Sequence, residues 1–135
     1  MYAMSAIPLS AILEHKLLVT SEIAIDFLGQ EDARVLGTPW LIAYLEWTAR
    51  NLVKPYLADG QDTVGTVVNV RHLAASPIGT QVSFRAIVKN VDDRRIWFDV
   101  EAWDEFEKIA DGTHERFIVD IARFAARVQE KVRRK

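Results

Sequence analysis

The sequence predicts a single α+β domain in which one long buried helix packs against an antiparallel sheet of about five strands. Two observations predict this class. Apolar residues recur at spacings of three and four along residues 38–54, as in a helix. After Gly60 the period changes to two, which is typical of strands. The chain has 135 residues, a usual length for one domain. We therefore assign residues 1–135 to one domain, with residues 1–16 and 125–135 peripheral.

The helix has clear start and stop signals. Thr38 can cap the free N–H groups, and Pro39 occupies the favoured first helical position. Pro55 disfavours a helical Lys54, so the regular helix should end there with one loose turn to Leu57. Two apolar stripes run along it, one of Leu41, Leu45, Thr48 and Leu52 and another of Trp40, Tyr44 and Trp47. A helix that is apolar around most of its circumference should be largely buried.

Strands are predicted on both sides of this helix. The first spans Leu17 to Ile25, after an extended or loosely ordered lead, and residues 29–36 form a loop or a short irregular helix. The later strands are predicted at residues 64–72, 80–88, 95–102 and 117–121, with turns at 77–79, 92–93 and 111–112. Tight turns between successive strands predict an antiparallel meander. The tail from Arg123 onward can form a short amphipathic helix.

Composition excludes several classes of function. The chain has no cysteine, which excludes disulfides, thiolate metal sites and a thiol nucleophile. Its formal net charge of −2 gives no basic excess for nucleic-acid binding, and the basic run at residues 131–135 is expected to be a solvated tail. The three histidines lack metal-ligand spacing, so no metal is expected. The absence of a signal peptide and of a membrane-length apolar run predicts a cytoplasmic protein.

Glu46 is the first candidate for a functional residue. It is the only acidic residue between Gly37 and Leu57, and its neighbours on the helix surface are largely apolar. Such a carboxylate is either partly desolvated at a functional site or pairs with a cation, for example Arg50 at i+4. The pattern alone favours neither interpretation.

Thr38 and His72 are weaker candidates. Helix capping is enough to explain Thr38, although a helix N-terminus also presents free N–H groups that can bind a developing oxyanion. His72 lies at the end of a strand, on the same face as Val68 and Val70. A lone histidine in that position is more often structural than functional.

Three segments together resemble one family. They are TPWLIAYLEW at residues 38–47, VGTVVNVRHLAASPIG at 64–79 and DGTHERFIV at 111–119. In order and spacing they resemble the hotdog-fold acyl-CoA thioesterases of the fluoroacetyl-CoA thioesterase type, over nearly all of residues 17–124. A strand, a long helix and four meandering strands is also the element order of a hotdog fold. The resemblance implies hydrolysis of an acyl-CoA thioester to the acid and free CoA, with CoA as part of the substrate and no separate cofactor.

The resemblance also implies roles for five residues. Thr38, Glu46 and His72 match the family's catalytic set, with Glu46 as nucleophile or general base, whereas Gly65 and Arg116 match its substrate-binding positions. In the specialised fluoroacetyl-CoA enzymes, aromatic groups ahead of the threonine cover the acyl pocket. The corresponding stretch, QEDAR at residues 30–34, has no aromatic residue. A different short or aryl acyl group is therefore expected.

One helix cannot cover both faces and edges of such a sheet, so a homodimer is expected, or a tetramer built from it. Thr38 and Glu46 are eight residues apart, about 12 Å along a helix. Either the thioester lies between them or one of them meets His72 of a second subunit. Two other functions fit the same pattern: a non-catalytic hotdog protein that binds an acyl group, and an enoyl-thioester hydratase, which would use a carboxylate and a histidine without the threonine.

Overall fold

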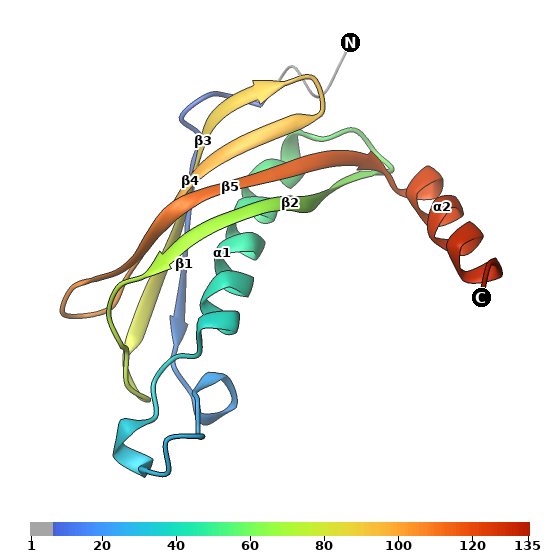
Figure 1. Cartoon of the computed structure of the whole chain (residues 1–135). Helices are drawn as coiled ribbons and strands as arrows, with labels where there is room; N and C mark the ends of the chain where they lie inside the picture. Colours follow the sequence, from blue (N-terminus) through green and yellow to red (C-terminus); the bar gives the residue numbers. More distant parts are fainter. Residues whose placement is uncertain (1–6) are drawn as a thin grey trace.

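The structure is a computed structural model and describes residues 7–135. A five-stranded antiparallel sheet curves around one long helix, α1 (Thr38–Val53), as Figure 1 shows. The strands are β1 (Ile12–Leu18), β2 (Gln61–His72), β3 (Gln81–Asp92), β4 (Arg95–Trp103) and β5 (Lys108–Asp120), in the spatial order β1-β3-β4-β5-β2. A second helix, α2 (Ile121–Arg133), follows β5, and three short 3-10 turns complete the fold: η2 (Ser21–Ile23), η3 (Glu31–Ala33) and η4 (Lys54–Tyr56). The predicted α+β class is confirmed.

The core lies between α1 and the concave face of the sheet. All four residues of the predicted core stripe are buried, and Phe84 and Phe98 lie fully buried in the sheet. The second apolar stripe differs from the prediction, because Trp40 is 42% and Trp47 51% exposed. The expectation of a helix buried around most of its circumference is therefore wrong for the described chain. The sheet covers α1 from one side only.

The prediction for the start of α1 is wrong, whereas the prediction for its end is confirmed. The N-terminal cap is Gly37, whose carbonyl accepts a hydrogen bond from the Leu41 N–H at 3.0 Å, and the Thr38 side chain does not cap the helix. The prediction that Thr38 is the cap is therefore wrong. At the other end, α1 stops at Val53 and residues 54–56 add one 3-10 turn, as Pro55 predicted.

The first strand lies earlier in the chain than predicted. β1 begins at Ile12, which pairs with Ile87 of β3, and ends at Leu18 opposite Gln81. Of the two states expected for the lead, extended or loosely ordered, residues 12–16 have the extended one, because they pair with β3. Residues 21–23 form a 3-10 turn instead of continuing the strand. Residues 1–6, the rest of that lead, lie outside the described residues.

Asp111 and Gly112 were predicted to form a turn, but they lie within β5. Gly112 pairs with Val70 of β2 and with Val100 of β4. A Cβ atom at this position would overlap the backbone carbonyl oxygen of Asn69, so the glycine is needed for a close approach of two strands. The β4–β5 turn lies at residues 104–107 instead.

β2 forms one open edge of the sheet. It is 12 residues long and contains a bulge at Thr66, the extra residue between two pairs in register. Val67 and Val68, next to the bulge, are 48% and 41% exposed. A long edge strand with exposed apolar residues is a surface that proteins usually cover.

The tail forms an amphipathic helix, as predicted, although α2 begins at Ile121 rather than near Arg123. The Ile121 N–H donates to the Gly60 carbonyl at 2.8 Å, which fixes the start of α2 beside the start of β2. From there α2 projects away from the sheet (Figure 1), and none of its residues is buried. Within residues 7–135, no helix is long and apolar enough to cross a membrane.

Substitution of Gly112 by alanine should destabilise the fold by about 2 kcal/mol, because the new methyl group must push β2 away from β5. Urea denaturation measures this loss of the free energy of unfolding. Replacement of the neighbouring exposed Thr113 by alanine is the matched control, expected to change stability by less than about 0.5 kcal/mol. Equal stability of the two variants would contradict the close-approach explanation.

Candidate functional site

Thr38 and His72 meet at the N-terminal end of α1. The Thr38 hydroxyl oxygen lies 2.8 Å from Nδ1 of His72, although the two residues are 34 positions apart in sequence. α1 supplies the threonine from its first turn, and the last residue of β2 supplies the histidine. With the imidazole proton on Nε2, Nδ1 accepts a hydrogen bond from the threonine hydroxyl. The hydroxyl that does not cap the helix therefore has a partner in the sheet.

The environment of His72 favours a neutral imidazole. Burial lowers its pKa below the ordinary value of 6.5, and the backbone of Ala74 partly opposes this shift. Nε2 of His72 is buried and has no hydrogen-bond partner among residues 7–135. A neutral histidine next to a hydroxyl can accept a proton during a reaction.

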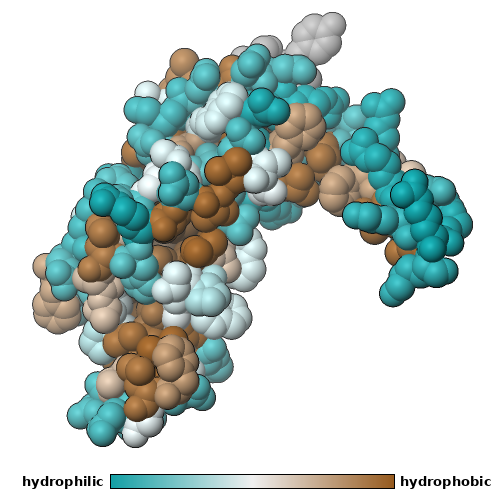
Figure 2. Space-filling view, viewed as in Figure 1, coloured by the Kyte–Doolittle hydropathy of each residue, from teal (hydrophilic) through white to brown (hydrophobic). Residues whose placement is uncertain are grey.

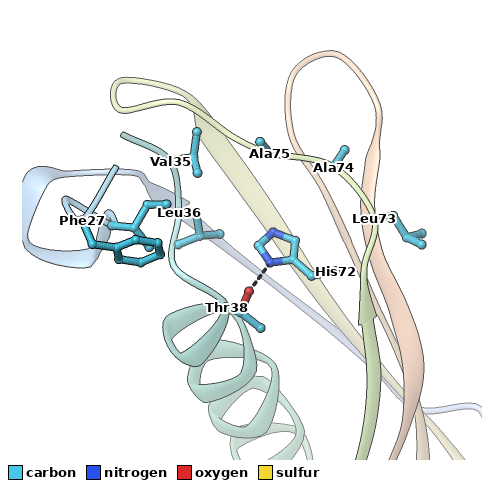
Figure 3. A pocket seen from close by; sticks show the side chains of 9 residues that line it. Phe27, Val35, Leu36, Thr38, His72, Leu73, Ala74 and Ala75 are labelled. Atoms are coloured by element: carbon cyan, nitrogen blue, oxygen red, sulfur yellow. Dashed lines mark hydrogen bonds between the residues drawn. The ribbon is translucent and has the colours of Figure 1, made fainter. Parts of the chain in front are cut away.

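A pocket of about 370 Å³ opens beside this pair. Figure 3 shows the imidazole pointing from the end of β2 to Thr38, with Phe27, Val35 and Leu36 on the far side of the hydrogen bond. The remaining lining residues are Ile25 and the three residues that follow His72. Apart from the threonine and the histidine, every lining side chain is apolar. A pocket with an apolar lining and two polar groups at one point suits a small ligand with one reactive polar centre.

Arg34 holds the outer wall of this pocket together. Its guanidinium donates to the backbone carbonyls of Ile25, at 3.1 Å, and Ser21, at 2.9 Å, and it forms an ion pair with Glu31. The wall also contains Phe27, an aromatic residue that lies just before the stretch 30–34. The expectation that no aromatic group precedes Thr38 at the acyl pocket was too narrow, because it considered only that stretch. The two adjacent large apolar residues Phe27 and Leu28, just before Gly29, were the sequence signal that could have indicated this wall.

Glu46 lies elsewhere on α1, in a second polar cluster. Its Oε2 accepts a hydrogen bond from Arg116 of β5 at 3.3 Å. Arg50, the cation suggested by sequence spacing, instead pairs with Asp62. A Cβ atom on Gly65 of β2 would lie only 2.5 Å from the same Oε2 atom. The glycine therefore leaves the space that the Glu46 carboxylate occupies.

Arg116 is almost fully buried, at 6% exposed, and all three nitrogens of its guanidinium have hydrogen-bond partners. It donates to the hydroxyl and the carbonyl oxygen of Thr63, at 2.7 and 2.8 Å. Burial lowers the pKa of Arg116, and the Glu46 carboxylate opposes that shift. The guanidinium thus fixes the carboxylate position from a rigid base in the sheet.

His114, which sequence reasoning did not select, supports Arg116. Its Nδ1 lies 2.7 Å from the carbonyl oxygen of Val67 at the β2 bulge, and its Nε2 lies 3.3 Å from a guanidinium nitrogen of Arg116. Burial lowers the pKa of His114, so the neutral ring can donate from Nδ1 and accept at Nε2. The histidine in the string THER, two residues before Arg116, was the only sequence signal for this contact.

The five predicted site residues therefore form two groups within one chain. Thr38 and His72 form the first, at the pocket, and Glu46, Gly65 and Arg116 form the second, about two helical turns further along α1. Among residues 7–135, no cluster of three or more histidine or acidic side chains has the arrangement to hold a metal ion.

Comparisons with known proteins point to one family. The sequence model of the family described as fluoroacetyl-CoA-specific thioesterase (FlK) matches residues 19–122. The fluoroacetyl-CoA thioesterase of Streptantibioticus cattleyicolor is 35% identical over 101 residues, which cover 75% of this chain and 73% of that protein. Both findings confirm the resemblance that the three sequence segments predicted.

Solved structures agree with the fold. A structure of the fluoroacetyl-CoA thioesterase FlK aligns with a TM-score of 0.84 at 29% identity, covering 92% of this chain and 96% of that one. A thioesterase superfamily member from Thermus thermophilus aligns equally well, at 27% identity over 96% and 98% of the two chains. A hot-dog-like protein from Thermanaerovibrio acidaminovorans, at 22% identity and a TM-score of 0.86 over 97% of each chain, shares the fold. The chain has the hotdog fold and belongs to the fluoroacetyl-CoA-specific thioesterase family.

Proposed function

We propose that this protein hydrolyses a short or aryl acyl-CoA thioester to the free acid and CoA. The observation that carries the proposal is the hydrogen bond between Thr38 and His72 at the end of an apolar pocket. The pocket suits the acyl group, and the polar pair is placed to act on its carbonyl. The family relationship supports the same reaction, and a mutant of FlK has been crystallised in complex with fluoroacetate and CoA.

The chemistry requires a polarised carbonyl, a nucleophile and departure of the CoA thiolate. The free N–H groups at the start of α1, next to Thr38, can stabilise negative charge on the carbonyl oxygen. His72 accepts and returns protons through Thr38. Glu46 supplies the carboxylate that activates water or attacks the carbonyl itself, and Arg116 and Gly65 hold that carboxylate in position beside the substrate.

The separation of the two groups supports a site completed by a homodimer. We propose that two copies pair along β2, the open edge of the sheet, in an antiparallel arrangement about a two-fold axis. Gly65 and the bulge at Thr66 lie near the middle of β2, so the axis passes close to Glu46. Each Glu46 then reaches the boundary between the subunits and can serve a thioester bound against the partner's Thr38 and His72. A tetramer of such dimers remains compatible with the proposal.

The pocket lining supports a short or aryl acyl group as the substrate class. Phe27, Ile25 and Val35 favour an apolar acyl group, and the volume of about 370 Å³ accommodates a short chain or a single aromatic ring. CoA is part of the substrate, and the proposed reaction needs no further cofactor. Because CoA thioesters are intracellular metabolites, the proposal places the protein in the cytoplasm.

Glu46→Gln and His72→Ala should each lower kcat/KM for the preferred acyl-CoA by about 10² to 10⁴, because each removes a group that transfers protons or attacks the carbonyl. Release of thiol from a panel of acetyl-, fluoroacetyl-, butyryl-, benzoyl- and phenylacetyl-CoA measures the activity. Glu107→Gln and His15→Ala, at exposed positions, are the matched controls. Unchanged turnover in the first pair would refute the assignment, and binding without turnover in the native protein would indicate an acyl-binding protein.

Gly65→Ala should lower kcat by at least about tenfold with little change in stability. The added methyl group would lie 2.5 Å from Oε2 of Glu46 and would displace the carboxylate, which can move because it is the end of a flexible, 34% exposed side chain. Steady-state kinetics and thermal unfolding of the same samples test this expectation. Asn69→Ala, at an exposed position of the same strand, should leave kcat near the native value.

Activity should fall at acidic pH with a midpoint below 6.5. Burial lowers the pKa of His72, so the neutral form that accepts from Thr38 persists below the ordinary titration range and is lost only when Nδ1 binds a proton. The pH profile of kcat/KM gives the midpoint. Titration of the His72 ring by NMR, assigned by comparison with His72→Ala, should give the same value, and a midpoint above 6.5 would contradict the structure.

A further inference from the structure

We propose that α2 of one copy docks over the mouth of the Thr38–His72 pocket of a second copy, so that the helix closes the acyl site of its partner. This inference rests on the antiparallel dimer proposed above and adds a surface that the dimer alone does not require. Three observations carry it: the exposed stripe of α2, its charge, and the position where α2 leaves the sheet.

An apolar stripe runs along α2, and none of its residues is buried against the described part of the chain, residues 7–135. The stripe consists of Ile121, Phe124, Val128 and Val132, at spacings of three and four. Ile121, Val128 and Val132 are 48%, 44% and 53% exposed. Figure 2 shows an open space between α2 and the rest of the molecule. An amphipathic helix of this kind is stable when its apolar stripe lies against another surface.

The charge of α2 selects the type of surface. Residues 121–135 contain six cations and one acid, Glu130, a net charge of +5. The whole chain has 17 cations and 19 acids, so residues 1–120 retain 11 cations and 18 acids, a net charge of −7. An anionic membrane would attract the helix but repel the body of the protein. A second copy of this body attracts the helix without that cost.

The rim of the pocket complements both the apolar stripe and the positive charge of α2. Phe27 and Leu73 line the pocket and are 77% and 48% exposed, and Leu28, which follows Phe27 in the chain, is 56% exposed. The neighbouring segment, residues 20–33, contains four acids and no cation: Glu22, Asp26, Glu31 and Asp32. Arg34, the next cation, already donates to backbone carbonyls of that segment. An apolar rim with acidic surroundings complements an apolar stripe flanked by arginine and lysine.

Antiparallel pairing of two β2 strands would place α2 of one copy near this rim of the other copy. α2 begins at Ile121, which is bound to Gly60 beside the first residue of β2, whereas the pocket residues 72–75 begin at the last residue of β2. These two ends of one strand are about 35 Å apart, and α2 is only about 20 Å long, so α2 cannot reach the pocket of its own chain. In an antiparallel pair of β2 strands, the start of each strand lies beside the end of the other. The partner's pocket is therefore the one within reach.

The native chain has no cysteine, which permits a direct test by cross-linking. Leu73→Cys and Val128→Cys chains carrying different tags are co-expressed, purified as the mixed species and treated with a short bismaleimide. We expect a covalent dimer in the mixed species and none in either variant alone, because equal positions lie at opposite ends of the dimer. Ala126→Cys, exposed on the opposite face of α2, replaces Val128→Cys in the control and should cross-link at least tenfold less.

The outcomes separate this inference from the proposed function. A monomer in light scattering would overturn the dimer and the docking together, whereas thiol release from acyl-CoA is measured independently of both. A dimer without the mixed cross-link, or with equal cross-linking through Ala126→Cys, would overturn the docking alone.

A second pair of variants tests closure of the site. Val128→Asp places a carboxylate against the acidic rim and should raise the KM for acyl-CoA by about tenfold. Ala126→Asp changes the charge of α2 equally and should have a much smaller effect. An equal KM in the two variants would overturn the claim that the stripe covers the pocket.

Discussion

Burial of one face of α1 against the concave sheet is the constraint on which the rest of this structure depends. Leu41 and Leu45 are almost completely removed from solvent, at 0% and 2% exposed, and each contributes about 2 kcal/mol through burial of apolar surface. That packing fixes the rotation of the helix. Thr38 consequently faces the end of β2, where it meets His72, and Glu46 faces Gly65, where Arg116 binds its carboxylate.

The same one-sided packing explains what the single chain leaves unfinished. Within residues 7–135, no helix covers the open edge of the sheet. The middle of β2, residues 65–69, is exposed along that edge. The proposed catalytic groups lie along that edge rather than at the centre of the core. An incomplete surface and an incomplete site thus coincide, and association of two chains would complete both.

Local patterns predicted the parts of the fold that depend on local sequence. The helix end at Pro55 and the hairpin at Asp92-Asp93 follow from the conformational limits of those residues, and the structure has both, with Asp92 as the last residue of β3 and the turn at residues 93–94. The start of β1 depends on its register with β3, because Ile12 pairs with Ile87, 75 residues away, so no local pattern could locate it. Gly112 was misassigned because a glycine serves a turn and a close approach equally well, and only the position of Asn69 distinguishes them.

The candidate site was predictable to the same extent. The spacing of Thr38, Glu46 and His72 is visible in the sequence, and its match to a family selected all three. The contacts around them were not visible, because Arg116 reaches Glu46 across 70 positions and His114 reaches Val67 across 47. Sequence spacing on α1 suggested Arg50 as the partner of Glu46, but Asp62 on β2 binds that arginine instead.

The loop held by Arg34 has a consequence for how such a protein diversifies. Backbone bridges join Ala24 to Leu36 and Val35 to Pro77, and Arg34 ties the carbonyls between them, so the loop keeps its path through its own main-chain contacts. Ile25 and Phe27 are then free to vary without disturbing the sheet or α1. Under the proposed function, selection acting on those two positions can change the acceptable acyl group while the hydrogen-bonded pair of Thr38 and His72 stays intact. Substrate range in such a scaffold can therefore evolve by exchange of one short, self-supporting module.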